Sequence, residues 1–411
     1  MKYVLLVPDG MSDRPQKSLG GRTPLGVART PNMDSIAAEG ITGTASTVPE
    51  SMSSGTAVAM LAVMGYDPTK YRIGRGPVEA ASMGIQLAEG DVAFRCNLVT
   101  AVDGVMVDSS AGHISTQEAH VLIDAIAADL SAPGVAFVPG VSYRHLVIFS
   151  KGGAADAEAL LAVRCTPPHD IVGEKTADYW PSGGAADAVG DLMERSQGAL
   201  SGHEVNTVRR DLGEREASMI WLWGQGARAD LPRFFDRWGV QGAVISAVDV
   251  VNGFAALAGM KVIHVEGATG YFDTNYEGKA AAAVDALSEV DFVLVHVEAT
   301  DEAGHIGDAK LKVRAIEDFD ARVVGPVLEG VRKYAEHRVL VVPDHATVIG
   351  ERSPHAHDPV PFAMCGWGIK PDGSAAYTEE EAQGGSVRLR RGYKLMERFI
   401  RREAASGKKL F

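Results

Sequence analysis

The chain has 411 residues, and its 40 lysines and arginines against 53 aspartates and glutamates give a formal net charge of −13. This acidic balance argues against a nucleic-acid-binding surface, which usually needs an excess of positive charge. A hydrophobic content of 46% with 23% charged residues excludes a disordered chain and predicts a globular protein of two or three domains.

The cysteines and the lengths of the apolar runs indicate the cellular compartment in which the protein is expected. The three cysteines, Cys96, Cys165 and Cys365, lie far apart and form neither a disulfide framework nor a CxxC metal site, which favours a reducing cytoplasm. The apolar run before Asp9 is too short for a signal peptide, and no stretch reaches the roughly 18 apolar residues of a membrane span. We therefore expect a cytoplasmic protein without membrane or nucleic-acid partners.

Short apolar runs alternate along the chain with segments of helical periodicity, which is the pattern of an α/β protein. Strands are predicted at 3–7, 94–99, 146–149, 219–223, 243–247, 261–265, 292–297 and 339–342. Helices are predicted at 30–39, 115–129, 187–196, 250–258, 276–288, 310–334 and 391–404. Several strands are near-continuous runs of valine, isoleucine and leucine, as expected for strands buried on both faces of a parallel sheet.

The middle of the chain differs from its two ends. Residues 79–214 contain weaker strands, more glycine, proline and serine, and the spaced arginines Arg95, Arg144, Arg209 and Arg210. We predict that this segment is a smaller domain inserted into a core domain formed by residues 1–78 and 215–411.

Three predicted strands are followed by residues of the types that bind metal ions. After the strands at 3–7, 292–297 and 339–342 come, in turn, Asp9; then Glu298, Asp301 and His305; then Asp344 and His345. Ligands of open α/β sheets bind at the carboxyl ends of parallel strands, so these segments should meet at one site. Asp301 and His305 are four residues apart, which would place both on one face of a helix.

A second cluster in the segment SPHAHDP contributes His355, His357 and Asp358. Carboxylates and neutral imidazoles suit Zn²⁺, Mn²⁺ or Fe²⁺. A single aspartate at a strand end is more often a helix cap, but acids clustered at one strand end would repel each other without a cation. The whole set therefore predicts a metal centre.

A metal centre of this kind that transfers phosphoryl groups would need a nucleophile beside it. Two divalent ions about 4 Å apart can hold the attacking and leaving oxygens of a phosphoryl transfer and activate a hydroxyl group. The segment VPESMSSGTAVAMLAV starts an apolar run that could form a buried helix, whose first N–H groups would bind phosphate. The candidate hydroxyls are Ser51, Ser53, Ser54 and Thr56, although the last three could equally cap the helix.

The order of these features resembles the alkaline phosphatase superfamily, and within it the archaeal-type cofactor-independent phosphoglycerate mutases and their bacterial relatives. Some bacterial members of this branch carry a proposed homoserine kinase label. The resemblance covers nearly the whole chain and is carried by VPDGMSDRP, GGRTPLGVARTPNMD, MGYDP, AFRCNLVT, HISTQEAH, TPPHDI, WLWGQG, GATGYFDTNYEGK, TDEAGH and PDHAT followed by HDPVPF. It implies an alkaline-phosphatase-like, mostly parallel sheet sandwiched by helices, with the inserted α/β domain as a lid.

Carried over by motif, the resemblance implies two metal sites, one with Asp301, His305 and His355 and the other with Asp9, Asp344, His345 and the nucleophile. The family's serine falls on Thr56, or on Ser54 if the alignment slips by two residues. The aspartate that usually follows falls on Ala57. Two Mn²⁺ ions are expected, with Zn²⁺, Co²⁺ or Mg²⁺ as alternatives, and no 2,3-bisphosphoglycerate would be needed.

The implied reaction is the interconversion of 3-phosphoglycerate and 2-phosphoglycerate through a phosphoenzyme, in glycolysis and gluconeogenesis. A lid would exclude water between the two steps. The substrate contacts expected in the lid are Arg95, Arg144, Arg209, Arg210 and His113, although each taken alone is more often a surface or structural residue. The one partner expected is this small phosphorylated substrate, and a homo-oligomer is left open.

Other functions are compatible with the same residues. The metal core could transfer phosphate to homoserine, hydrolyse a phosphoester, or bind metal without catalysis. The segment 224–229 follows a predicted strand, fits G-x-G-x-x-A and is followed by Asp249 at the end of the next strand. This pattern is typical of dinucleotide-binding oxidoreductases. In that pattern a helix begins directly after the glycines.

Overall fold

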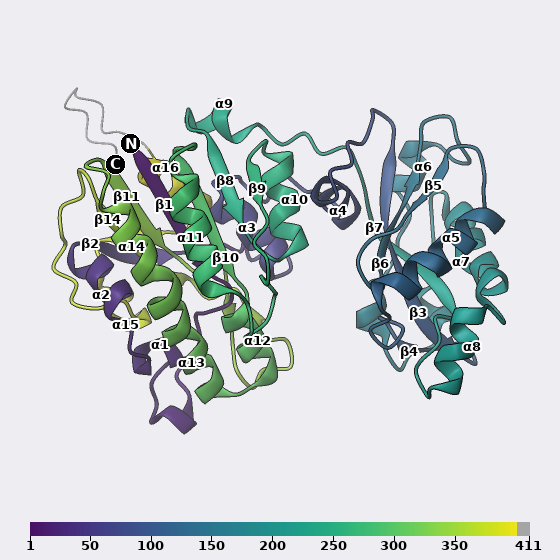
Figure 1. Cartoon of the computed structure of the whole chain (residues 1–411), viewed down its shortest axis with the longest axis horizontal. Helices are drawn as coiled ribbons and strands as arrows, with labels where there is room; N and C mark the ends of the chain where they lie inside the picture. Colours follow the sequence, from purple (N-terminus) through teal and green to yellow (C-terminus); the bar gives the residue numbers. More distant parts are fainter. Residues whose placement is uncertain (401–411) are drawn as a thin grey trace. The chain divides into compact units, whose positions relative to one another are not determined.

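A computed structural model describes residues 1–400, and the chain forms two compact units (Figure 1). The first unit comprises Met1–Arg72 and the chain from Leu231 onward, and the second comprises Ile73–Asp230. The second unit thus extends beyond the expected insertion, 79–214, at both of its ends. Among the described residues, no helix combines the length and the apolar character that crossing a lipid bilayer requires.

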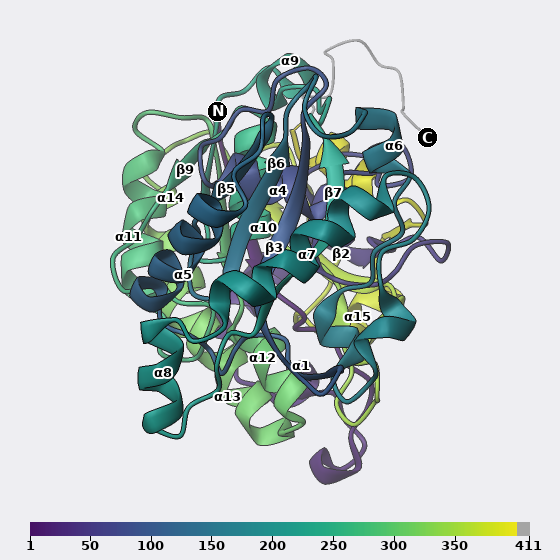
Figure 2. The same cartoon turned by 90° about the vertical axis from the view of Figure 1, so that its right-hand side faces the viewer.

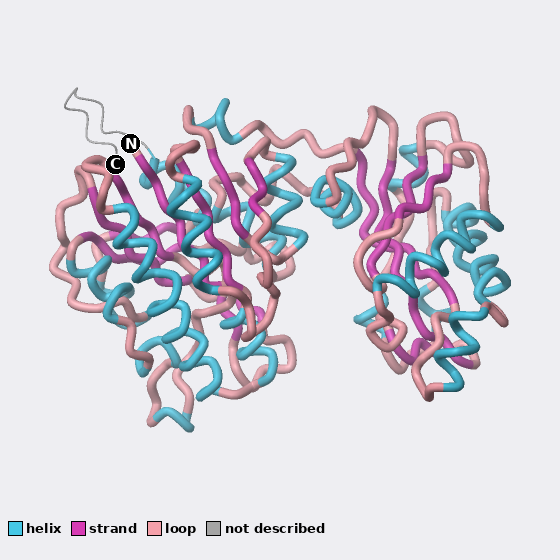
Figure 3. Tube along the Cα trace, viewed as in Figure 1, coloured by secondary structure: helices cyan, strands magenta, loops and turns pink. Residues whose placement is uncertain are grey.

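The first unit is built on an eight-stranded sheet, drawn in magenta in Figure 3. Its strands lie in the order β15 (Val387–Leu389), β2 (Gly40–Ala45), β14 (Val360–Gly366), β11 (His337–Val341), β1 (Lys2–Pro8), β10 (Phe292–Val297), β8 (Gly242–Ile245) and β9 (Lys261–Ile263). The strands from β11 to β9 are all parallel, and β14 is antiparallel to both of its neighbours. This mostly parallel sheet between helices confirms the predicted fold class.

The first unit also contains helices, a short two-stranded ladder and 3₁₀ turns. They are α1 (Pro24–Val27), α2 (Pro31–Ala38), α3 (Thr56–Val63), α9 (Phe234–Trp238), α10 (Asp249–Leu257), α11 (Tyr276–Ala286), α12 (Ala299–Ile306), α13 (Ala309–Phe319), α14 (Gly325–Val331), α15 (Glu379–Gly384) and α16 (Leu395–Ile400). A short ladder, β12 (Ala346–Thr347) with β13 (His355–Ala356), lies beyond the main sheet, and 3₁₀ turns cover Lys17–Leu19 and Gly392–Lys394.

Strand β1 shows why the central parallel strands are mostly apolar. Val4 and Leu6 pack on one face of the sheet in a cluster with residues of α2, α11, α13 and α14. On the other face the ring of Tyr3 lies 5.5 Å from that of Phe399 in α16. Because both faces are covered, every side chain of the strand gains from leaving water, by roughly 25 cal/mol per Å² of apolar surface.

Two predicted helices differ from those observed. The helix expected at 310–334 is divided by a π turn at Asp320–Val324, where Asp320 accepts hydrogen bonds from the first turn of α2 and Pro326 follows. A proline lacks the N–H that a continuous helix would use. The helix expected at 391–404 begins with the 3₁₀ turn and continues as α16, and its residues 401–404 lie outside the described part.

The second unit is an antiparallel sheet covered by helices on both faces. Its strands are β3 (Val92–Val102), β4 (Val105–Asp108), β5 (Val135–Val138), β6 (Arg144–Phe149) and β7 (Met219–Ala227). Helices α5 (Thr116–Asp129) and α7 (Ala186–Leu200) lie over one face in Figure 2, and α4 (Arg75–Ser82) packs against the other. Its remaining helical segments are α6 (Ala157–Leu161), α8 (Glu204–Asp211) and the 3₁₀ turns Pro168–Ile171 and Thr176–Tyr179.

Strand β7 corrects two expectations. It pairs with β3 of the second unit, whereas the sequence placed the strand 219–223 in the core domain. Gly224 and Gly226 lie within this strand, and the next helix, α9, begins only at Phe234, so the dinucleotide-binding interpretation is wrong. The glycines allow α4 to approach the sheet, because a Cβ at Gly226 would lie 2.7 Å from Pro77 Cγ.

Candidate active site

Three adjacent parallel strands bring the predicted acids and histidines to one edge of the first unit's sheet. Asp9 follows β1, and Asp344 and His345 follow β11, its neighbour. All three side chains are fully buried. Asp301, 4% exposed, lies in the first turn of α12, which starts after β10 on the other side of β1.

Asp301 is the centre of the first group of candidate ligands. His305 lies one turn later on α12, and its Nε2 is 3.0 Å from Asp301 Oδ2. His355, on the short strand β13, has Nε2 3.5 Å from Asp301 Oδ1 and 2.9 Å from His305 Nε2. The structure therefore brings together the three residues that the resemblance assigns to one metal site.

Asp9, Asp344 and His345 form the second group. His345 Nε2 lies 3.3 Å from Asp9 Oδ1 and 3.5 Å from Asp344 Oδ2. The other oxygen of Asp344 accepts a hydrogen bond of 3.1 Å from the backbone N–H of Gly10. This bond orients the Asp344 carboxylate toward the other members of the group.

Of the candidate nucleophiles, Thr56, the first residue of α3, has its hydroxyl beside the second group. Thr56 Oγ1 lies 3.4 Å from Asp9 Oδ2 and 3.4 Å from His345 Nε2. Ser54 Oγ instead donates a hydrogen bond of 2.8 Å to the carbonyl of Ala356. The first N–H groups of a helix have no intrahelical partner, so the start of α3 can also receive an anion.

Burial and the charges of neighbouring groups shift the pKa values of the acids at this site. Burial raises the pKa of Asp9 well above its usual range, and the charges of Asp344, Glu298 and Asp301 raise it further. Burial and the Asp301 charge raise the pKa of Glu298 to about 8. Burial acts on Asp301 as well, but hydrogen bonds with histidines, first that with His305, outweigh it and hold its pKa well below the ordinary value.

These donors fit divalent cations. Asp9 Oδ1 and Asp344 Oδ2 are buried without a hydrogen-bond partner among the described residues. Buried carboxylate oxygens need a partner or a cation, and oxygen with imidazole nitrogen is a donor set that Mn²⁺ and Zn²⁺ accept. The candidate ligands form three sets, and within each set the ligand atoms lie within 4.8 Å of one another. The sets are Asp301, His345 and His355; Asp9, Asp344 and His345; and Asp9, His296 and Glu298.

His296 belongs to the site but was not predicted. It is fully buried in β10, with Nε2 2.9 Å from Asp9 Oδ2 and Nδ1 3.1 Å from Ser246 Oγ. Burial lowers its pKa to about 4, so the imidazole is neutral at pH 7. By sequence alone, the run FVLVHV predicts an ordinary buried strand. A histidine inside a strand buried on both faces requires polar partners, and this was the available signal.

Lys279 is a second unpredicted residue beside the acids. Its side chain is 1% exposed and donates a hydrogen bond of 3.2 Å to the carbonyl of His296. Burial lowers the pKa of Lys279 to about 8, although the nearby Glu298 charge opposes this shift. A lysine therefore already supplies positive charge to the set that contains His296 and Glu298, which favours the other two sets for metal ions.

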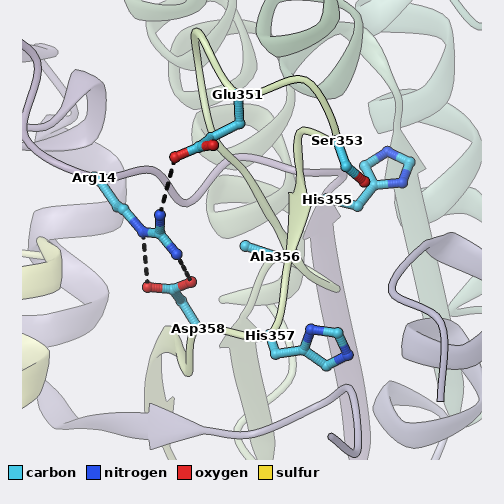
Figure 4. A pocket seen from close by; sticks show the side chains of 7 residues that line it. All are labelled: Arg14, Glu351, Ser353, His355, Ala356, His357 and Asp358. Carbon is cyan, nitrogen blue, oxygen red and sulfur yellow. Dashed lines mark hydrogen bonds and ion pairs between the residues drawn. The ribbon is translucent and has the colours of Figure 1, made fainter. Parts of the chain in front are cut away.

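A cavity of about 420 Å³ opens beside His355 (Figure 4). Arg14 lines it and forms a two-pronged ion pair with Asp358, at 2.8 and 3.2 Å, and a 3.3 Å contact with Glu351. His357 also lines it, but its Nε2 pairs with the carbonyl of Met52 at 2.8 Å. A cavity of this size accepts a small molecule next to the metal-type ligands.

The predicted substrate-binding residues all lie in the second unit. Arg95 is 4% exposed, pairs with Glu79 at 2.8 Å and lies over the ring of Trp223 at 5.2 Å. The guanidinium of Arg144 lies 6.0 Å from the ring of Tyr143. His113 is exposed, and its own ring lies 6.1 Å from the same tyrosine.

Arg209 and Arg210 are neighbours in α8 with different surroundings. Arg209 is 2% exposed, and its N–H groups bond to Glu118 at 2.9 Å and to the carbonyls of Ala111 and Arg215. These bonds hold together three segments of the unit. Arg210 is exposed and forms a two-pronged pair with Glu216 at 2.6 and 2.7 Å.

Several known proteins are similar to this chain over nearly its whole length. A family profile described as 2,3-bisphosphoglycerate-independent phosphoglycerate mutase matches residues 37–206. The chain is 50% identical to proteins of that name from Methanothrix thermoacetophila, over 97% of this chain and all of the relative, and from Methanothermobacter thermautotrophicus, over 97% and 96%. Its fold is similar to a solved cofactor-independent phosphoglycerate mutase from Thermoplasma acidophilum, with a TM-score of 0.67, 30% identity and coverage of 97% and 99%. A solved protein from Pyrococcus horikoshii gives a TM-score of 0.82 at 29% identity, covering 97% and 96%.

Proposed function

The chain belongs to the family of 2,3-bisphosphoglycerate-independent phosphoglycerate mutases, and we propose that it interconverts 3-phosphoglycerate and 2-phosphoglycerate through a phosphoenzyme on Thr56. One observation carries the proposal. The Thr56 hydroxyl, at the start of a buried helix, lies 3.4 Å from both Asp9 Oδ2 and His345 Nε2. A hydroxyl in that position can accept a phosphoryl group beside cation ligands.

We infer that two divalent ions serve this site. Asp301, His305 and His355 would hold one, and Asp9, Asp344, His345 and the Thr56 hydroxyl would hold the other. When bound, such ions neutralise the buried carboxylates, lower the pKa of a hydroxyl and stabilise charge on a phosphoryl group. We propose Mn²⁺ as the ion, and the same donors accept Zn²⁺, Co²⁺ and Mg²⁺.

The proposed reaction has two half-reactions on one nucleophile. Thr56 Oγ1 loses its proton and forms a bond to the phosphorus of 3-phosphoglycerate, while the bond from phosphorus to the C3 oxygen breaks and that oxygen takes up a proton. The glycerate stays bound and reorients. Its C2 hydroxyl then loses a proton and bonds to the phosphorus, while the bond to Thr56 Oγ1 breaks and that oxygen takes up a proton. The phosphoryl group is conserved throughout, so no second phosphate donor is needed.

Water must be kept from the phosphothreonine, since hydrolysis would convert the mutase into a phosphatase. We propose that the second unit acts as a lid and that its cations hold the glycerate carboxylate. Arg144, Arg210 and His113 are less buried than Arg95 and Arg209, which supports the first three as substrate contacts. The bonds of Arg209 support a structural role for that residue within the lid.

The test is formation of 2-phosphoglycerate from 3-phosphoglycerate by Mn²⁺-loaded protein without added 2,3-bisphosphoglycerate. We expect turnover that EDTA abolishes and that Thr56→Ala reduces by about a thousandfold or more, because it removes the nucleophile. Thr56→Ser keeps the hydroxyl and should keep activity. Ser54→Ala is the matched control and should remain active.

Mass spectrometry of acid-quenched protein should find one phosphoryl group on the peptide that contains Thr56. A different outcome would sink the mutase assignment: no conversion with Mn²⁺, Co²⁺, Mg²⁺ or Zn²⁺, but metal-dependent release of phosphate from an aryl phosphate. The search would then turn to other acceptors, with homoserine first.

A further inference from the structure

Thr347 lies at the junction of the two groups of candidate ligands. It belongs to β12, and its side chain is fully buried. Its Oγ1 donates a hydrogen bond to Asp301 Oδ1 and lies 3.2 Å from His345 Nδ1. One hydroxyl therefore contacts a member of each group.

We propose that Thr347 is a positioning residue that fixes His345 in the tautomer protonated at Nδ1, and so directs an unprotonated Nε2 into the second metal group. This inference rests on the proposed function, since it concerns the same site. It assigns a role to a residue outside the predicted ligand set, and it explains how the two groups are linked.

Counting hydrogens decides the tautomer. The hydroxyl of Thr347 has one hydrogen, and the Asp301 carboxylate can only accept, so that hydrogen is used on Asp301. The hydroxyl then presents only lone pairs to His345 Nδ1. The carbonyl of Ala346, 3.4 Å from the same Nδ1, can also only accept. Both neighbours therefore require an N–H at Nδ1, and in the neutral imidazole this leaves Nε2 as a lone pair.

The consequence appears on the other side of the ring. Nε2 of His345 faces Asp9 Oδ1 at 3.3 Å and Asp344 Oδ2 at 3.5 Å, and both oxygens lack a hydrogen-bond partner among the described residues. A divalent cation among these three groups would be bound by all of them at once. The tautomer set by Thr347 thus makes this group a set of cation ligands and not a closed hydrogen-bond network.

Packing prevents Thr347 from turning away. A Cβ at Gly304 would lie 2.5 Å from Thr347 Cγ2, and a Cβ at Gly10, whose φ is +57°, would lie 2.4 Å from Thr347 Oγ1. The backbone is held too, because Thr347 N–H donates to the carbonyl of Ser12 at 3.0 Å and Lys312 Nζ donates to Thr347 O at 2.6 Å. The orientation of the hydroxyl is therefore built into the fold.

The first test measures binding of Mn²⁺ alone to the metal-free full-length chain, from the electron paramagnetic resonance signal of the free ion. We expect Thr347→Val to weaken binding about tenfold or more, the usual range for loss of a group that orients metal ligands. Thr347→Ser retains the hydroxyl and should restore most of the affinity. Thr47→Val is the matched control, because Thr47 is a buried threonine of the same unit, 2% exposed, whose hydroxyl has no described partner.

The second test reads the tautomer directly. In metal-free, ¹⁵N-histidine-labelled protein at pH 8, the nitrogen resonances of His345 should show the proton on Nδ1 in the wild type and in Thr347→Ser. They should shift toward a mixture of tautomers in Thr347→Val. The spectrum of His345→Asn assigns the resonances. This measurement on the wild type holds even if the valine variant folds poorly.

A proton on Nε2 in the wild type would overturn the proposal, and so would wild-type Mn²⁺ affinity in a folded Thr347→Val. Neither readout requires mutase activity. If 3-phosphoglycerate is not converted while Thr347→Val still loses Mn²⁺ affinity and tautomer order, the proposed function fails and the role of Thr347 stands.

Discussion

The candidate metal ligands of the first unit and the buried arginines of the second unit hold their charges in opposite ways. In the first unit, Asp9 and Asp344 each keep one buried oxygen without a hydrogen-bond partner among the described residues. In the second unit, the buried guanidinium of Arg95 meets Glu79 at 2.8 Å, and that of Arg209 meets Glu118 at 2.9 Å. Burial of a charged side chain is therefore not by itself a sign of function. A buried charge whose counter-charge the chain does not supply is the better sign.

Sheet topology accounts for much of the difference. Parallel strands of the first unit end at one edge, so residues that follow each strand converge. In the second unit every strand pair is antiparallel, and successive strand ends alternate between two edges. The two buried arginines there meet acids from helices, Arg95 with Glu79 of α4 and Arg209 with Glu118 of α5, so their counter-charges lie within the unit.

The largest effect that would test this comparison is expected from Asp9→Asn. Turnover should fall by about a thousandfold or more, because the variant loses a proposed metal ligand beside the proposed nucleophile. The metal-free variant should nevertheless be more stable than the metal-free wild type by about 1 kcal/mol at pH 7. The folded state raises the pKa of Asp9, so ionisation above the ordinary pKa of 3.8 favours the unfolded chain.

Turnover of the Mn²⁺-loaded proteins measures the loss of activity. Thermal unfolding of the EDTA-treated proteins measures the gain in stability. Added Mn²⁺ should raise the melting temperature of the wild type far more than that of the variant. A metal-free Asp9→Asn that unfolds below the wild type would contradict the claim that this acid is held at a cost in stability.

The same kind of substitution in the second unit should have the opposite effect on stability. Glu79→Gln leaves the Arg95 guanidinium buried without its counter-charge, which should cost about 3 kcal/mol. Added Mn²⁺ should not restore it. Urea unfolding measures the loss. Glu216→Gln is the matched control, because it breaks the exposed pair with Arg210 and should leave stability unchanged. An equal loss in both variants would remove the distinction between buried and exposed pairs.

A smaller effect is expected from pH in the second unit. Burial lowers the pKa of His145 to about 3, and its Nε2 has no described partner while Nδ1 accepts from the N–H of Gly140 at 3.0 Å. The unfolded chain binds the proton near pH 6.5, so stability should fall by about 2 kcal/mol between pH 6.5 and pH 4.5. Urea midpoints across this range measure the slope, and His145→Gln should flatten it. An unchanged slope in that variant would assign the acid sensitivity to another group.

The acids of the first unit have the opposite sensitivity. Burial, together with the Asp301 charge, raises the pKa of Glu298 to about 8, so metal-free protein loses stability as the pH rises from the ordinary pKa of 4.5 to about 8, and this group adds no further loss above that pH. Stability should thus fall towards low pH because of His145 in the second unit, and towards higher pH because of Glu298 in the first.

Much of the candidate site could be predicted because its signals are local. Asp9, Asp344 and His345 directly follow apolar runs, and Asp301 and His305 have helical spacing. The antiparallel strands β2 and β14 were not predicted, since their glycine, threonine and proline residues give no clear apolar alternation. Placement of β7 was wrong because an apolar run shows that a strand is buried but does not identify the sheet that buries it.

The choice between Thr56 and Ser54 also required the fold. Both hydroxyls occur within three residues of sequence, and only the direction in which α3 starts separates them. Thr56 faces Asp9 and His345, whereas Ser54 is bonded to the carbonyl of Ala356.

The sequence by itself determined which residues could bind metal ions and that they would converge, because parallel strands convert positions after successive apolar runs into neighbours in space. Only the tertiary structure decided which polar groups are satisfied. The partners that matter are distant in the chain: Asp9 and His296 are 287 residues apart, and Arg209 and Glu118 are 91 apart. Hydrogen bonding depends on contacts of a few ångströms, and no local pattern of residues encodes contacts across such separations.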